Sequence, residues 1–189
     1  TGKIEAKTRA YKLSRKFISY FSFATFILLF VFAEELGSLI LGDLQGGNTI
    51  TDVAFVIRCV SFAVLIVPHL SVAKGYLQGH EYVGPSSTAN LIEQVVRIFV
   101  ILAGSYLCYK VLNGSLTLTI GIAVSGAFFG GLVAYYYLKR QINKNKKVLD
   151  LDKKLEKDDI SNKEIIKKIA IYAVPAIVLN LISSIYSFT

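Results

Sequence analysis

The sequence predicts an all-α protein, a polytopic bundle of transmembrane helices, and two observations carry this prediction. First, 53% of the 189 residues are hydrophobic and the mean hydropathy is +0.53, whereas only 18% are charged. Soluble domains of this size contain fewer apolar and more charged residues. Second, of the 21 Lys and Arg residues, 6 lie before Phe17 and 11 lie in segment 139–168. Membrane proteins concentrate charge in this way, in the loops outside their spans.

Five stretches are long enough to cross the hydrocarbon core of a bilayer, which takes about 20 mostly apolar residues. We expect the first helix to begin near Phe17, to continue past the interfacial residues Glu34 and Glu35, and to end near Gly42. The other spans are expected at 53–72, 86–109, 116–138 and 169–189. Pro68 would kink the span at 53–72, and Pro175 would kink the span at 169–189.

The loops indicate which way the bundle is inserted. Segments 1–16 and 139–168 hold most of the basic residues and are separated by four spans, so the positive-inside rule puts both in the cytoplasm. The polar loop predicted at 74–85 then lies on the cytoplasmic side as well. The loop at 42–52 carries no Lys or Arg and is expected outside.

The charge pattern also suggests three parts of the chain. Residues 1–139 are expected to form the first helices with a cytoplasmic lead-in, 140–162 a charged cytoplasmic connector, and 163–189 the start of a second lobe. Within the connector, apolar residues at helical spacing fit either a surface helix or a solvated linker, and Ser161 with Glu164 fits a capping box. The chain starts in a basic stretch and stops inside an apolar one, so we expect a piece of a longer transporter.

Charged residues inside spans are the best candidates for a functional site, because each costs about 2.5–3.5 kcal/mol to insert. Glu93 and Arg97 are four residues apart, so they share a helix face and can pair. They would either line a water-filled cavity or join packed helices. Arg58 lies near the outer end of its span, where it would either reach the headgroups or take a cavity role.

Other patterns favour ordinary structural roles. Cys59 and Cys108 lie in apolar segments and are expected to be free thiols. His69 and His80 have no partner at metal-ligand spacing, so neither a metal nor a cofactor is expected. A set of glycines in the fourth span fits close helix packing, namely Gly121, Gly126, Gly130 and Gly131.

The net charge of +8 does not point to nucleic acid, because the basic runs flank apolar spans and face anionic lipid instead. Nor does the sequence contain a nucleophile with a base, a phosphate-cradling loop or paired carboxylates, so an enzyme is not expected.

Two motifs resemble a known family. Residues 74–80 read Lys-Gly-Tyr-Leu-Gln-Gly-His, Gly84 and Pro85 follow, and 92–97 read Ile-Glu-Gln-Val-Val-Arg. This pattern resembles the polysaccharide exporters of Gram-positive bacteria, the YtgP/SpoVB group of the MOP superfamily, which includes MurJ-type lipid II flippases. The resemblance implies a partial N-lobe of a two-lobed flippase, covering about helices three to seven, in the bacterial cytoplasmic membrane.

The resemblance also implies a function. Such a protein would flip an undecaprenyl-diphosphate-linked sugar precursor to the outer leaflet by alternating access. Its partners would be membrane lipids, this substrate and the missing helices of the same chain. Lys74 and Gln78 become candidates in the cytoplasmic loop, and Lys74 stands where relatives often have Arg. The family's essential cavity arginines lie largely outside this chain. The alternatives are a multidrug/cation antiporter of the same superfamily and a non-transporting scaffold for cell-wall synthesis.

Overall fold

The computed structural model describes residues 2–42, 49–111, 113–145, 167 and 171, and the regular structure in these residues is helical. The elements are α1 (Gly2–Val31), α2 (Ala33–Leu41), α3 (Ile50–Gln78), α4 (Gly84–Phe99) and α5 (Leu116–Lys144). Helix α4 continues into two short π-helical segments, η1 (Val100–Gly104) and η2 (Leu107–Val111). The predicted all-α class is confirmed.

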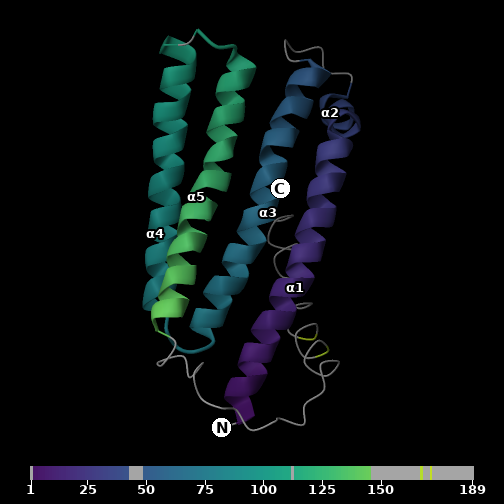
Figure 1. Ribbon diagram of the computed structural model, residues 1–189. Coiled ribbons are helices and arrows are strands. Elements are labelled where there is room, and N and C mark those ends of the chain that lie inside the picture. Colours follow the sequence, from purple (N-terminus) through teal and green to yellow (C-terminus); the bar gives the residue numbers. More distant parts are fainter. Residues whose placement is uncertain (1, 43–48, 112, 146–166, 168–170, 172–189) are drawn as a thin grey trace, which may run out of the picture.

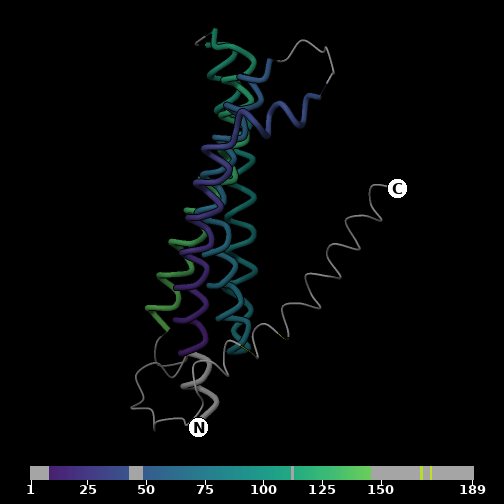
Figure 2. The backbone as a smooth tube through the Cα atoms, turned by 90° about the vertical axis from the view of Figure 1, so that its right-hand side faces the viewer, coloured from purple at the N-terminus to yellow at the C-terminus, as the bar shows by residue number. Residues whose placement is uncertain are grey.

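The long helices stand side by side in the order α4, α5, α3, α1 (Figure 1). Helix α5 packs against α4 and α3, and α3 packs against α1. Figure 2 shows the four helices overlapping in a narrow column, from which α2 projects sideways. The bundle is therefore one layer of helices.

Four of the predicted spans are confirmed by length and composition, and they are 9–31, 50–78, 84–111 and 116–144. The fifth, at 169–189, lies outside the described residues except for Ile171. The start of α1, the turn between α3 and α4, and the end of α5 lie at one end of the bundle (Figure 1). We call this the basic end, and the opposite end the acidic end. This arrangement agrees with the predicted topology.

The first predicted helix is broken, contrary to expectation. Phe32 has φ −87° and ψ 21°, outside the helical region, and α2 begins at the next residue in a new direction. Glu34 and Glu35 fall in the first turn of α2. Carboxylates are favourable there because the helix dipole is positive at its N-terminus. The predicted end near Gly42 is confirmed, with φ +50° at that glycine.

The predicted loop at 74–85 is shorter than expected, and this corrects the placement of Lys74 and Gln78. Both lie in the last turns of α3, which ends at Gln78. The helix continues because Leu70, Ala73 and Leu77 keep a buried face at helical spacing. These residues pack with Ala89 of α4 and with buried residues of α5, so the core of the described part lies toward the basic end.

Helix α5 also runs further than its predicted span, to Lys144, so residues 140–144 of the predicted connector are helical. Residues 146–162 of that connector, with the capping box proposed at Ser161 and Glu164, lie outside the described residues. The division into lobes stays a prediction.

Candidate functional site

The main polar feature within the spans is a cluster of three charged side chains, which we call the Glu93 cluster. Arg97 Nη2 donates to Glu93 Oε1 at 2.7 Å, and Lys74 Nζ donates to Glu93 Oε2 at 2.9 Å. The first contact is the predicted pair across one turn of α4. The second joins α3 to α4 across 19 residues of sequence. One carboxylate therefore bridges two cations.

The cluster is largely shielded. The side chain of Glu93 is 11% exposed, that of Lys74 18% and that of Arg97 31%. Arg97 lies half-way along the 84–111 span, and Glu93 lies one turn nearer the basic end. Charges buried in hydrocarbon are stable only when they are paired, so each cation needs the shared carboxylate.

The glycines of α5 bring that helix directly against the cluster. A Cβ added to Gly130 would lie 2.6 Å from the backbone oxygen of Glu93, and one added to Gly126 would lie 3.1 Å from that of Arg97. Only glycine allows the two backbones to approach this closely. The predicted packing role of these glycines is thus borne out, and it fixes the position of the turn that carries both charges.

The polar character extends from the cluster toward the basic end. Gln78 lies one turn beyond Lys74 on α3, and its Nε2 donates to the hydroxyl of Ser86 at 3.3 Å. Ser86 is fully buried and lies two turns from Glu93 on α4. Four side chains thus follow one another along the α3–α4 contact, from Gln78 and Ser86 to Lys74 and Glu93.

The charges of the cluster do not cancel. Two cations and one carboxylate leave a net charge of +1. Lysine offers three N–H donors and arginine five, more than one carboxylate can accept. The Nε of Arg97 is buried and meets no acceptor among the described residues. The arrangement can therefore take a further anionic oxygen.

Arg58, the remaining candidate, lies elsewhere. It is 16 positions before Lys74 on α3, a separation of about 24 Å along the helix at 1.5 Å per residue. Its Nη2 donates to Glu34 Oε1 at 3.0 Å, and its guanidinium lies 5.8 Å from the centre of the Phe30 ring. The side chain is 38% exposed, so Arg58 belongs to a surface pair near the acidic end.

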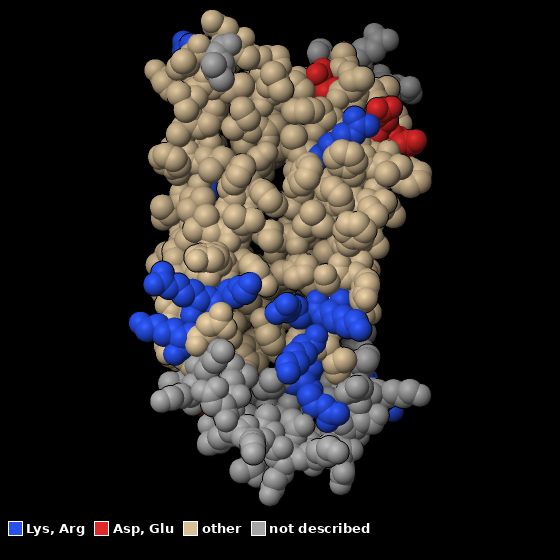
Figure 3. All heavy atoms as spheres, in the orientation of Figure 1, with Lys and Arg blue, Asp and Glu red and all other residues tan. Residues whose placement is uncertain are grey.

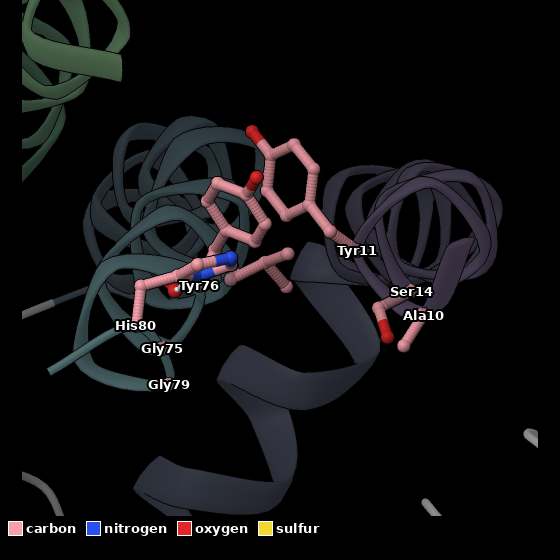
Figure 4. Close-up of a pocket in the computed structure, with 8 residues that line it drawn as sticks. Ala10, Tyr11, Ser14, Gly75, Tyr76, Gly79 and His80 are labelled. Atoms are coloured by element: carbon pink, nitrogen blue, oxygen red, sulfur yellow. Dashed lines mark hydrogen bonds between the residues drawn. The ribbon is translucent and has the colours of Figure 1, made fainter. Parts of the chain in front are cut away.

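Histidine and cysteine take structural places. Cys59 and Cys108 are free, as predicted. The rings of His80 and Tyr76 are tilted against each other with centroids 4.5 Å apart, and Tyr76 contacts Tyr11 of α1 at 4.3 Å. Figure 4 shows Tyr11 pointing from α1 toward Tyr76, beside a cavity of about 300 Å³. The described residues contain no group of three or more side chains suited to a metal ion.

The sequence did not predict the Lys74–Glu93 contact. Because a loop was predicted from Lys74 onward, Lys74 was not placed in a span. An ion pair between Lys74 and a residue of the next span was therefore not considered. The signal that could have found it is the buried spacing Leu70, Ala73, Leu77, which continues the helix past Lys74.

Comparison with known proteins supports the motif resemblance. Residues 2–189 match the family described as "Polysaccharide biosynthesis protein". The lipid II flippase MurJ of Bacillus subtilis (strain 168) is 35% identical over 139 residues, which are 71% of this chain and 26% of that protein. An uncharacterized membrane protein of the same organism, YabM, is 30% identical over 172 residues, 90% of this chain and 30% of its own length. No solved structure matches the chain.

The chain therefore spans less than a third of the length of either relative. Its four described spans indicate a multi-pass membrane protein. On the match over nearly its whole length, the chain belongs to the polysaccharide biosynthesis protein family, among the MurJ-like membrane transporters of the MOP superfamily.

Proposed function

We propose that this chain is part of a flippase that moves an undecaprenyl-diphosphate-linked sugar precursor across the bacterial plasma membrane by alternating access. The observation that carries the proposal is the Glu93 cluster, with its net charge of +1 in the middle of an apolar span. A lipid-linked diphosphate must bring negative charge across hydrocarbon, and a buried cationic site lowers the free-energy cost of that step.

In this proposal the diphosphate competes with Glu93 for Arg97 and Lys74. The planar guanidinium of Arg97 can hold two phosphate oxygens at once, and the ammonium of Lys74 adds a point charge. Glu93 keeps both cations in place while the site is empty. A cation antiporter would need the opposite balance, because the cluster repels a second cation.

The basic end faces the cytoplasm in this proposal, in accordance with the positive-inside rule. The headgroup approaches from there, past the exposed Gln78, and reaches Lys74 before Arg97. No chemical bond is made or broken, so the protein acts as a transporter and not as an enzyme. Its partners are membrane lipids, the substrate and the other helices of the full-length protein.

The test is complementation of cells depleted of their native lipid II flippase, using the full-length protein. Lys74→Ala leaves the neutral pair of Glu93 and Arg97 intact, so folded abundance should stay close to wild type. The site loses its net positive charge, and we expect complementation to fall at least tenfold. Arg97→Lys should recover only part of the loss caused by Arg97→Ala, because an ammonium lacks the planar fork.

The control is Arg58→Ala, which removes a cation near the acidic end and should complement fully. Membrane abundance is measured alongside by immunoblot. Full complementation by Lys74→Ala, or by Glu93→Gln combined with Arg97→Gln, would refute a role of the cluster in transport.

A further inference from the structure

A furrow with a volume of about 790 Å³ runs between α1 and α5 at the basic end. The backbones of α1 and α5 do not approach each other in the described part of the chain, and α3 forms the floor between them. Lys12, Arg15 and Lys16 of α1 line one side, His69 of α3 lines the floor, and Tyr135 of α5 lines the other side. Figure 3 shows basic side chains gathered over the lower parts of both flanking helices.

The furrow carries one sign of charge. Three cations line it, and no carboxylate does among the described residues. The imidazole of His69 on the floor and the phenol of Tyr135 on the side add polar atoms, and their rings lie 6.4 Å apart. The lining is therefore suited to bind an anionic group. A protein helix packed in the furrow would need carboxylates to pair with the three cations.

Beyond this cationic part the same helix faces become aromatic. A step of seven residues returns almost to the same side of a helix, about 10 Å further along. From Ser19, His69 and Tyr135, a step of seven toward the acidic end reaches three phenylalanines, namely Phe26, Phe62 and Phe128. Phe62 lies 5.3 Å from Phe26 and 6.3 Å from Phe128, and it is 42% exposed.

The furrow is separate from the Glu93 cluster. His69 and Lys74 are five positions apart on α3, so they point about 140° apart around that helix. Tyr135 and Gly130 have the same spacing on α5, and Gly130 contacts the turn that carries Glu93. The two features thus lie on different sides of α3 and α5.

We propose that the furrow binds one anionic phospholipid of the inner leaflet, independently of the transported substrate. The phosphate lies among Lys12, Arg15 and Lys16, at the level where the bilayer carries its own phosphates, and an acyl chain follows the aromatic strip of Phe26, Phe62 and Phe128. A bound phospholipid joins α1 to α5, whose backbones do not approach each other in the described residues. A lipid that binds only the folded state raises its stability by mass action.

The first experiment measures the melting temperature of the full-length protein in nanodiscs of phosphatidylcholine, with and without phosphatidylglycerol. Phosphatidylglycerol should raise the melting temperature of the wild type. The triple variant Lys12→Gln, Arg15→Gln, Lys16→Gln should lose at least half of that rise. The matched control, Lys139→Gln, Arg140→Gln, Lys144→Gln, removes the same charge at the same end but outside the furrow, and should keep the rise. Equal losses in both variants would show diffuse surface attraction and overturn the proposal.

The second experiment leaves all charges in place, so it holds even where the triple variant fails to fold. A photoreactive benzophenone residue replaces Ser19 in the furrow of the full-length protein, and irradiation is followed by mass spectrometry. An adduct with the mass of phosphatidylglycerol supports the proposal. An adduct within the same polypeptide would show that another helix fills the furrow. An adduct with undecaprenyl diphosphate in preference to phosphatidylglycerol would show that the furrow binds the substrate. Either result overturns the proposal.

Discussion

Two ion pairs of similar chemistry lie on α3, and their surroundings differ. Lys74 meets Glu93 at 2.9 Å between two helices, and neither side chain is more than 18% exposed. Arg58 meets Glu34 at 3.0 Å near the acidic end, where the side chains are 38% and 60% exposed. The bond lengths are nearly equal. The two pairs therefore differ in desolvation, which is large at the first pair and small at the second.

The comparison shows why the two regions can have different roles. A buried carboxylate that holds two cations is hard to replace and leaves one positive charge over, which suits a site that must exchange partners. An exposed pair contributes little free energy. Its charges cancel, so it does not attract an anion into the membrane. Beside the Glu93 cluster, Gln78 and Ser86 form a further polar contact between α3 and α4, on the side of the basic end.

The largest effect is expected from Glu93→Gln. The change removes the only carboxylate of the cluster and leaves two partly buried cations, Lys74 and Arg97, beside each other. Breaking a buried charge pair typically costs about 3–5 kcal/mol, so folded abundance in the membrane should fall strongly. The measurement is the fraction of protein that stays monodisperse after mild detergent extraction. Lys74→Ala is the matched comparison, because it leaves the neutral pair of Glu93 and Arg97. Equal losses of monodisperse protein in both variants would show that the shared carboxylate does not hold the cluster together.

A smaller, graded effect is expected from the glycines that contact the cluster. Gly130→Ala would put a Cβ 2.6 Å from a backbone oxygen, which cannot move without shifting α4, and Gly126→Ala would put one at 3.1 Å. Overpacking of this kind costs about 1–3 kcal/mol. We expect the melting temperature to fall more for Gly130→Ala than for Gly126→Ala.

Gly75→Ala is the control for this series. Nothing in the described part of the chain lies within 4 Å of a Cβ at that position, and alanine is the better helix former. Its melting temperature should equal or exceed that of the wild type. A fall as large as that of Gly130→Ala would contradict the close α4–α5 contact.

The order and direction of the four described spans could be predicted because hydrophobic length and the distribution of basic residues act over whole segments. The break at Phe32 could not, because Leu36–Leu41 continues the apolar pattern and the change of direction depends on a single residue. The π-helical segments after Phe99 continue the same apolar pattern, so they could not be predicted either.

The candidate site was predicted in part. Glu93 and Arg97 were paired from their spacing alone, since four residues make one helical turn. The contact of Lys74 with Glu93 depends on how α3 and α4 cross, which no local pattern encodes. Arg58 looked similar to Arg97 in the sequence, as a cation within a span. What separates them is the exposure of the carboxylate each one meets, which is 60% for Glu34 and 11% for Glu93.

The smallest effect is expected at that exposed pair, and it sharpens the comparison most. Arg58→Ala, Glu34→Ala and the double variant form a thermodynamic cycle, and exposed pairs contribute about 0–1 kcal/mol. We therefore expect the melting temperatures of all three variants to lie close to the wild type, and complementation to be unchanged. Arg58 also lies over the Phe30 ring, so part of any loss should persist in Arg58→Ala after Glu34 is removed. A coupling free energy as large as that measured by the same cycle for Lys74 and Glu93 would mean that exposure does not distinguish the two regions. A loss of complementation without a loss of stability would instead bring Arg58 into the transport path, the alternative that its place in a span left open.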